Sequence, residues 1–143
     1  MTRIVAGSAK GRTLAVPKSG TRPTSERVRE ALFSRLDHMN VLEGAVVLDL
    51  YAGTGALGLE ALSRGAATAT LVEKASGAAR VATSNVRSTG LSARVVTADA
   101  RAYLAARSGQ VLSGEVDLVF IDPPYDIAEA DMTAVLEGLA PWI

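Results

Sequence analysis

Short apolar runs alternate with longer mixed segments from about residue 45 to the end of the chain. The runs are rich in Val, Leu and Ala, and they predict buried strands at 46–50, 68–72, 93–97 and 116–121. The mixed segments between and after them predict helices over about 56–64, 75–88, 101–107 and 128–139. Repeated strand–helix units imply a mainly parallel sheet with helices on both faces, so we expect a doubly wound α/β fold.

The first forty residues follow another pattern. Two apolar stretches, residues 3–7 and 13–16, flank a basic segment that contains glycine, and together they predict a β-hairpin. Residues 20–25 then predict a loop, because they combine Gly, Pro, Ser and Thr. We therefore expect a hairpin extension before the α/β core.

A helix is predicted directly after this loop. Thr24 or Ser25 can cap its start, and the helical pattern continues to about Asp37. The apolar residues at helical spacing, which we expect to form its buried face, are Val28, Ala31, Leu32 and Leu36.

Basic residues are concentrated in the same N-terminal segment. Residues 1–40 hold eight Lys or Arg and three acidic residues, whereas the other 103 residues hold seven basic and twelve acidic residues. A basic arm on an acidic body is typical of proteins that bind phosphate backbones, although a solvated arginine-rich face has the same composition. A helix start also attracts phosphate. The candidate phosphate-binding residues are Arg3, Lys10, Arg12, Arg22, Arg27 and Arg29.

The composition argues against several other classes of protein. The chain has no cysteine, which excludes disulfides, cysteine-ligated metals and a cysteine nucleophile. No apolar run approaches the roughly 18–20 residues that span a bilayer. The N-terminus lacks the apolar stretch of a signal peptide. We therefore expect a soluble, cytoplasmic protein.

Acidic residues stand at or directly after the carboxyl ends of the four predicted core strands. They are Asp49, Glu73, Asp99 and Asp122. Ligands of doubly wound proteins bind at this edge of the sheet, so these carboxylates are predicted to surround one binding site.

A glycine loop lies at the same edge. Residues 53–58 match the G-x-G-x-x-G pattern of dinucleotide-binding turns, with Glu73 at the spacing of a ribose-binding acid. Asp49, four residues before the first glycine, favours S-adenosylmethionine instead, because it can hold an ammonium group but would repel a pyrophosphate. Two residues, Tyr51 and Ala52, also delay the glycines relative to the strand end. On this interpretation Glu73 binds the ribose hydroxyls and Asp99 the adenine amino group.

Asp122-Pro123-Pro124-Tyr125 follows the last predicted strand. The two prolines cannot donate hydrogen bonds to a sheet, so the backbone is stiff and its carbonyls are free. An acid, free acceptors and an aromatic ring suit a flat ring that carries an amine, such as a nucleobase. An ordinary turn uses the same residue types, so the tetrapeptide alone leaves both interpretations open.

Together these motifs resemble the S-adenosylmethionine-dependent amino-methyltransferases. The segments that carry this resemblance are Asp49–Gly55, Glu73, Asp99 and Asp122–Tyr125. Further segments look like the RsmD family, and the arginine–proline–threonine helix start is the most specific of them. These further segments are Arg3–Gly7, Gly11–Leu14, Arg22–Phe33 and Gly55–Gly65.

The RsmD resemblance implies a Rossmann-like methyltransferase fold and methylation of the N2 amine of one guanine in bacterial 16S ribosomal RNA. The implied catalytic residues are Asp122, Pro123 and Tyr125, with no metal ion. The residues implied to bind S-adenosylmethionine are Asp49, Tyr51, Gly53, Gly55, Glu73 and Asp99. The implied RNA-binding residues are Arg3, Lys10, Arg12, Arg22, Arg27 and Arg29, and the partner would be 16S RNA or a small-subunit particle, bound by a monomer.

In this organisation residues 1–40 form an RNA-binding extension and residues 41–143 the cofactor-binding core. The family's sheet has seven strands, whereas a fifth core strand is predicted to begin at Pro141, so the C-terminal strands are expected to be missing. Two alternatives share parts of the pattern. An N6-adenine DNA methyltransferase has the same Asp-Pro-Pro-Tyr, and a NAD-dependent oxidoreductase has the same glycine pattern.

Overall fold

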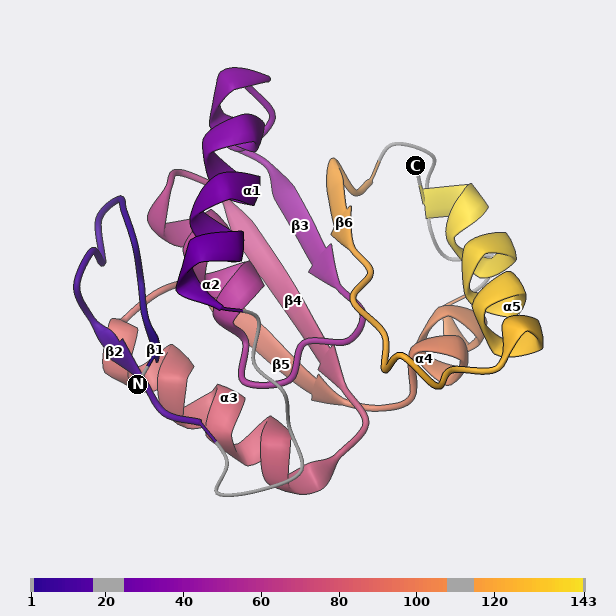
Figure 1. Ribbon diagram of the computed structural model, residues 1–143. Coiled ribbons are helices and arrows are strands. Elements are labelled where there is room, and N and C mark those ends of the chain that lie inside the picture. Colours follow the sequence, from indigo (N-terminus) through magenta and orange to yellow (C-terminus); the bar gives the residue numbers. More distant parts are fainter. Residues whose placement is uncertain (1, 17–24, 108–114, 143) are drawn as a thin grey trace.

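The computed structural model describes residues 2–16, 25–107 and 115–142. A four-stranded parallel sheet forms its core, in the order β5-β4-β3-β6 (Figure 1). Its strands are β3 (Val46–Asp49), β4 (Thr68–Glu73), β5 (Ala93–Thr97) and β6 (Leu118–Phe120). The helices that follow them are α2 (Ala56–Ser63), α3 (Ser76–Thr89), α4 (Ala100–Ala106) and α5 (Glu129–Leu139). The predicted doubly wound fold is confirmed, with small shifts of the element ends.

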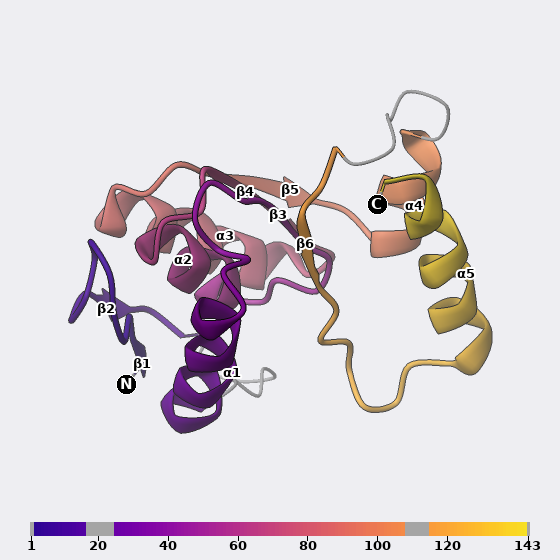
Figure 2. The ribbon, with the colours of Figure 1, turned by 90° about the horizontal axis from the view of Figure 1, so that it is seen from above.

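Helices cover both faces of this sheet (Figure 2). Because successive strand residues point to opposite faces, Val47 packs in one apolar cluster and Leu48 in the other. The first cluster includes side chains of α2 and of the helix α1 (Glu26–His38), and the second includes side chains of α4 and α5. In the described residues, no helix is both long and apolar enough to cross a membrane.

The N-terminal residues form the expected hairpin. Its strands β1 (Thr2–Arg3) and β2 (Thr13–Leu14) are antiparallel, with Thr2 opposite Leu14. Ile4 and Leu14 are almost fully buried in the first apolar cluster. The hairpin is therefore packed on the core beside α2 (Figure 1).

Helix α1 begins as predicted but turns a different face to the core. The hydroxyl of Ser25 caps the helix by accepting a hydrogen bond from the Val28 amide at 3.2 Å. Arg29 and Phe33 are its buried residues, whereas Val28 is 58% and Leu32 37% exposed. The predicted apolar face is therefore only partly right. Leu36 packs against the first apolar cluster as expected, but Val28, Ala31 and Leu32 are exposed, because a buried ion pair of Arg29, described below, fixes the rotation of this helix.

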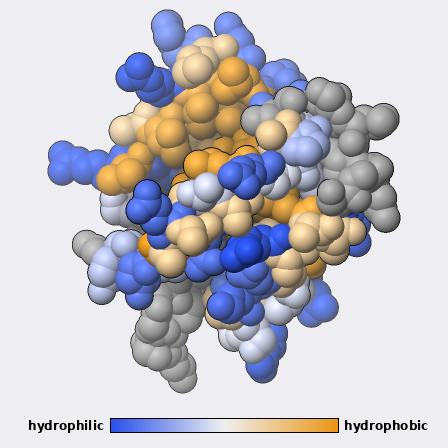
Figure 3. Space-filling view, turned by 90° about the vertical axis from the view of Figure 1, so that its right-hand side faces the viewer, coloured by the Kyte–Doolittle hydropathy of each residue, from blue (hydrophilic) through white to orange (hydrophobic). Residues whose placement is uncertain are grey.

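The last described residues also differ from the prediction. Residues Ala140–Trp142 form a short 3-10 helix and not the start of a fifth core strand. The Trp142 ring is buried in the second apolar cluster and lies 5.8 Å from the Tyr103 ring, measured between centroids. Strand β6 is thus the edge of the described sheet, and apolar side chains reach the surface on this side of the molecule (Figure 3).

Candidate active site

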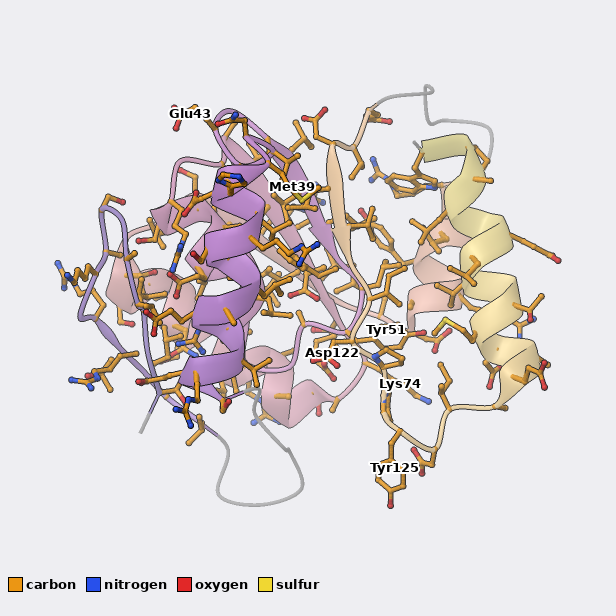
Figure 4. All side chains as sticks on the ribbon, turned by 45° about the horizontal axis from the view of Figure 1, so that its top comes forward. Met39, Glu43, Tyr51, Lys74, Asp122 and Tyr125 are labelled. Carbon is orange, nitrogen blue, oxygen red and sulfur yellow. The ribbon has the colours of Figure 1, made fainter. Side chains whose placement is uncertain are left out.

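The carboxyl ends of the four core strands open onto one cleft of about 1220 Å³. Tyr51, Glu73, Asp99 and Asp122 all line it, each following or ending a different strand. Figure 4 shows Tyr51 and Asp122 close together at this edge of the sheet. The structure therefore brings together three of the four acids that the sequence placed at the strand ends, Glu73, Asp99 and Asp122.

Asp49 lies behind the wall of this cleft. Its side chain is fully buried, and neither carboxylate oxygen has a hydrogen-bond partner within the described residues. The pKa of Asp49 is raised from 3.8 to about 7, mainly by burial and to a smaller extent by the nearby charges of Asp122 and Glu73. The backbone dipoles of Tyr51 and Gly58 act in the opposite direction. A buried acid of this kind is a strong acceptor for a cationic ligand group.

The glycine loop owes its shape to two residues with positive φ. Gly53 has φ 56° and Gly55, which precedes α2, has φ 86°. Gly58 serves packing instead, since an added Cβ would lie 2.3 Å from a methyl carbon of Leu71 on β4. The same glycine pattern therefore lets the loop turn and brings α2 close to the sheet.

Glu73 ties this loop to the next strand. Its carboxylate accepts hydrogen bonds from the amides of Gly53 and Ala75, both at 2.8 Å. Glu73 thus holds the loop at the cleft while its oxygens keep further lone pairs for a ligand.

Asp99 combines two tasks at the start of α4. One of its oxygens accepts from the Ala102 amide at 3.1 Å and caps the helix. The negative charge of Asp99 also contributes to a raised pKa of Tyr51, after the larger effect of burial. Asp99 and Tyr51 are therefore near neighbours on the cleft wall.

The Asp122-Pro123-Pro124-Tyr125 segment forms one rim of the cleft. Its backbone enters a turn, in which the Ile127 amide donates a hydrogen bond to the Pro124 carbonyl at 3.1 Å. The Tyr125 ring is 97% exposed and points away from the body of the protein (Figure 4). The face of this ring is therefore accessible to a ligand.

Several cleft residues were missed by the sequence analysis. Lys74 follows Glu73 and brings a cation to a cleft lined mostly by acidic charges, and its place directly after a strand end could have identified it. Arg101 and Asp131 form an exposed ion pair at 2.9 Å that joins α4 to α5. No local pattern predicted this pair, because its partners are 30 residues apart.

The candidate RNA-binding residues of the N-terminal arm, residues 1–40, divide into two groups. Arg3, Lys10, Arg12 and Arg27 lie at the surface, and Arg3 forms only a loose ion pair with Glu26 at 3.7 Å. Such exposed pairs contribute little, so these charges remain available to a phosphate. Arg22 lies outside the described residues.

Arg29 is the exception, and the prediction that it contacts RNA is wrong. Its side chain is fully buried, and its Nε donates to the Glu60 carboxylate at 3.3 Å. Its guanidinium also donates to the Arg3 carbonyl. Arg29 therefore holds the hairpin from inside the protein.

Glu60 is the centre of this buried network. Its carboxylate accepts from the amides of Val5 and Ala6, at 2.9 and 3.1 Å, and from the Nε atoms of Arg29 and Arg64. A glutamate inside an otherwise apolar helix is the sequence signal that could have revealed it. The network fixes the basic hairpin to the helix that follows the glycine loop.

Comparisons with known proteins identify the family of this chain. The model of a family described as conserved hypothetical protein 95 matches residues 2–142. The chain belongs to this family. It is 44% identical over 125 residues to ribosomal RNA small subunit methyltransferase D of Escherichia coli K12, which confirms the resemblance to the RsmD family. The match covers 86% of this chain and 60% of that protein, so the chain spans three fifths of its relative's length.

Solved structures confirm the fold of this RsmD-family chain. A hypothetical protein of Thermus thermophilus superposes with a TM-score of 0.85 at 38% identity, over 98% of this chain and 80% of the other. A Pyrococcus abyssi tRNA (uracil-54, C5)-methyltransferase superposes with a TM-score of 0.61 at 22% identity, over 85% of this chain and 27% of the other. The fold is therefore the Rossmann-like methyltransferase fold.

Proposed function

We propose that the chain is the cofactor-binding and catalytic part of an S-adenosylmethionine-dependent methyltransferase that acts on the exocyclic N2 amine of a guanine in 16S ribosomal RNA. The observation that carries this proposal is the convergence of Glu73, Asp99 and Asp122 at one cleft, with the buried carboxyl of Asp49 near enough to Asp122 and Glu73 for their charges to raise its pKa. The RsmD relative named above supports the RNA substrate.

The residues of the cleft fit this cofactor. Asp49 has two buried oxygens without hydrogen bonds among the described residues, and an ammonium group would supply the missing donors and positive charge. Glu73 offers lone pairs to ribose hydroxyls, and Asp99 offers an acceptor to the adenine amine. A dinucleotide fits less well, because its pyrophosphate would face this acidic surface.

When bound, S-adenosylmethionine supplies an electrophilic methyl group. The part of the protein is to present the amine to it. A guanine amine is a weak nucleophile, because its lone pair is delocalised into the ring. Asp122 and the Pro123 carbonyl would accept hydrogen bonds from that amine and so draw its lone pair out of the ring. Tyr125 would stack on the base, at a gain of about 1–3 kcal/mol.

The target base has to leave its stack to enter the cleft. Arg3, Lys10, Arg12 and Arg27 would hold the surrounding phosphates, which position the RNA without reading its sequence. In this division of labour residues 1–40 bind RNA and residues 41–143 bind the cofactor. The protein would act as a monomer in the bacterial cytoplasm.

Methyl transfer from labelled S-adenosylmethionine to three substrates tests the proposal. We expect label in 16S RNA or in partly assembled small ribosomal subunits, and not in naked DNA. Nucleoside analysis should find the methyl group on N2 of guanine. Label on N6 of adenine in DNA, or tighter binding of NAD than of S-adenosylmethionine in a parallel titration, would contradict the proposal.

A further inference from the structure

Asn85 joins two parts of the molecule that the proposed function uses separately. It lies on α3 and is 1% exposed. Its Nδ2 donates to the carbonyl of Ala15 at 3.0 Å and to the carbonyl of Thr54 at 2.9 Å. Its Oδ1 accepts from the Ala15 amide at 2.7 Å. One side chain therefore holds the N-terminal arm by both backbone groups of one residue, and the glycine loop by a third bond.

The two partners of Asn85 have different places in the site. Ala15 directly follows β2, the second strand of the basic hairpin. Thr54 stands between Gly53 and Gly55 in the loop that lines the cleft, and the Gly53 amide donates to Glu73. A continuous path of hydrogen bonds and short backbone segments thus leads from the arm through Asn85 and the loop to Glu73.

Only an amide side chain can make this junction. Asparagine supplies two N–H donors and a carbonyl acceptor from one planar group, and all three hydrogen bonds are made here. Because the site is buried, each bond that is removed would leave a backbone group without a hydrogen bond, at a cost of about 1–3 kcal/mol. Packing alone would not require a polar side chain at this position.

We propose that Asn85 is a positioning residue that couples cofactor binding to the placement of the RNA-binding arm. The inference rests on the proposed function, since it takes the cleft as the cofactor site and the arm as the RNA site. Gly53 and Gly55 have positive φ, and glycines give a loop access to many backbone conformations. A ligand that selects one loop conformation also fixes the Thr54 carbonyl, and through Asn85 it fixes Ala15.

Hydrogen–deuterium exchange of the 143-residue chain, with and without S-adenosylhomocysteine, tests this coupling. We expect the ligand to slow exchange in residues 53–58 and also in residues 2–16. The exchange rate of the Ala15 amide should fall by at least about 5-fold, which is the lower end of the effects usually measured between two coupled sites. If the ligand binds and protects the loop while residues 2–16 exchange as before, the coupling is refuted and the proposed function stands. If the ligand does not bind, the proposed function fails and the coupling with it.

Two variants assign the coupling to Asn85. In Asn85→Ala, saturating ligand should still protect the loop but no longer slow exchange in the arm. Thr89→Val is the matched control, because the Thr89 hydroxyl also makes a buried hydrogen bond on α3, to the Asn85 carbonyl at 2.8 Å, and its described hydrogen bonds all stay within that helix. An arm that still responds in Asn85→Ala, or that stops responding equally in Thr89→Val, would overturn the role of Asn85. Asn85→Asp, which keeps the acceptor and lacks both donors, replaces Asn85→Ala if that variant does not fold.

Discussion

Asp49 is buried without a hydrogen-bond partner among the described residues, and burial favours the neutral, protonated form of its carboxyl. At its folded pKa of about 7 the carboxyl keeps a proton that the unfolded chain, with an ordinary pKa of 3.8, has already lost. Between these two values the folded state binds more protons than the unfolded state, so the contribution of Asp49 to stability falls as the pH rises. Above about pH 7 the buried carboxylate is charged and attracts a cation. The residue is thus unfavourable for the empty protein and suited to a cationic ligand.

Asp49→Asn should therefore stabilise the ligand-free protein at alkaline pH. The gain in free energy of unfolding over the wild type should grow between about pH 4 and pH 7 and then level off. Urea denaturation of both proteins across this range measures it, and titrating groups that do not interact with Asp49 cancel in the difference. A difference that does not change with pH would contradict the raised pKa.

The same variant should bind the cofactor poorly. Ionised Asp49 attracts an ammonium group, so the wild-type affinity for S-adenosylmethionine should rise with pH below about 7. The rise should be at most about tenfold per pH unit, because one proton is released from Asp49 for each cofactor bound. The amide that replaces this carboxyl carries no charge, so the weaker affinity of the variant should lack this pH dependence. Calorimetric titration of the wild type and the variant at several pH values measures the two affinities and their pH dependence.

Asp122→Ala should abolish methyl transfer and leave cofactor affinity nearly intact, because Asp122 is proposed to face the amine. We expect a loss of at least about 100-fold in kcat, the size seen when one electrostatic contact to a reacting group is removed. Asp126→Ala is the matched control, as Asp126 lines the same cleft and is exposed. Equal losses of activity and of cofactor binding in Asp122→Ala would contradict its assigned role.

For single residues, the sequence predicts the place of a residue in the fold better than it predicts which groups surround its side chain. The strand periodicity and the acids after each strand place Glu73, Asp99 and Asp122 at one cleft. The burial of Asp49 and the ion pair of Arg29 with Glu60 could not be predicted, because they depend on which segments meet in space. Arg29 and Glu60 are 31 residues apart, and nothing local distinguishes buried Arg29 from its neighbours in the sequence.

At the scale of the elements, the hairpin is held by α2 and not only by its own two-residue strands. Ser63 accepts a hydrogen bond from the Ser8 amide through its carbonyl at 2.7 Å, and one from the Ala9 amide through its hydroxyl at 2.9 Å. The same hydroxyl donates to the Ala6 carbonyl at 2.6 Å. An isolated hairpin is marginally stable in water, so the bonds to Ser63 and Glu60 stabilise it together with the burial of Ile4 and Leu14.

Gly7→Ala should loosen the hairpin. An added Cβ would lie 1.8 Å from the Ser63 carbonyl oxygen, so the hairpin would have to move away from α2. Gly11→Ala is the matched control, because Gly11 has nearly the same φ, 85° against 88°, but nothing within 4 Å of the added atom. The control should cost only the strain of its positive φ, about 1–2 kcal/mol.

Urea denaturation and binding of 16S RNA distinguish the two variants. Gly7→Ala should lose more free energy of unfolding than Gly11→Ala and should also bind RNA more weakly. Similar losses in both would mean that the contact with Ser63 does not hold the hairpin.

The order of the core elements up to α5 followed from the sequence, but the rotation of α1 did not. Periodicity favoured a face with Val28 and Leu32, since apolar residues usually face the core. In the structure Phe33 lies 5.6 Å from the Phe120 ring, between centroids, and buried Arg29 lies beside Glu60. A charged side chain is tolerated inside a protein only when an oppositely charged group is buried beside it. For Arg29 this group is Glu60, which lies on another helix, so the sequence of α1 alone does not reveal it.

At the scale of the whole molecule, the basic hairpin lies on one side of α2, and the carboxyl ends of the core strands, whose residues line the cleft, lie on the other (Figure 1). A base that enters the cleft and a phosphate that binds the hairpin must therefore belong to one RNA long enough to reach both. The hairpin would then contribute affinity through phosphates, and the cleft would contribute the chemistry. This arrangement predicts that RNA binding depends on salt and that cofactor binding does so much less.

Replacing Lys10 and Arg12 together by alanine should therefore weaken RNA binding and lower its salt dependence. For every phosphate that the hairpin no longer neutralises, the slope of log affinity against log salt should fall by about 0.7 for single-stranded and about 0.9 for duplex nucleic acid. Arg80→Ala with Arg94→Ala is the matched control, because it removes the same charge from exposed positions outside residues 1–40. If both pairs change the slope equally, RNA responds only to net charge. A change confined to the first pair means that RNA binds at the hairpin, whose place on α2 is fixed by Glu60 and Ser63.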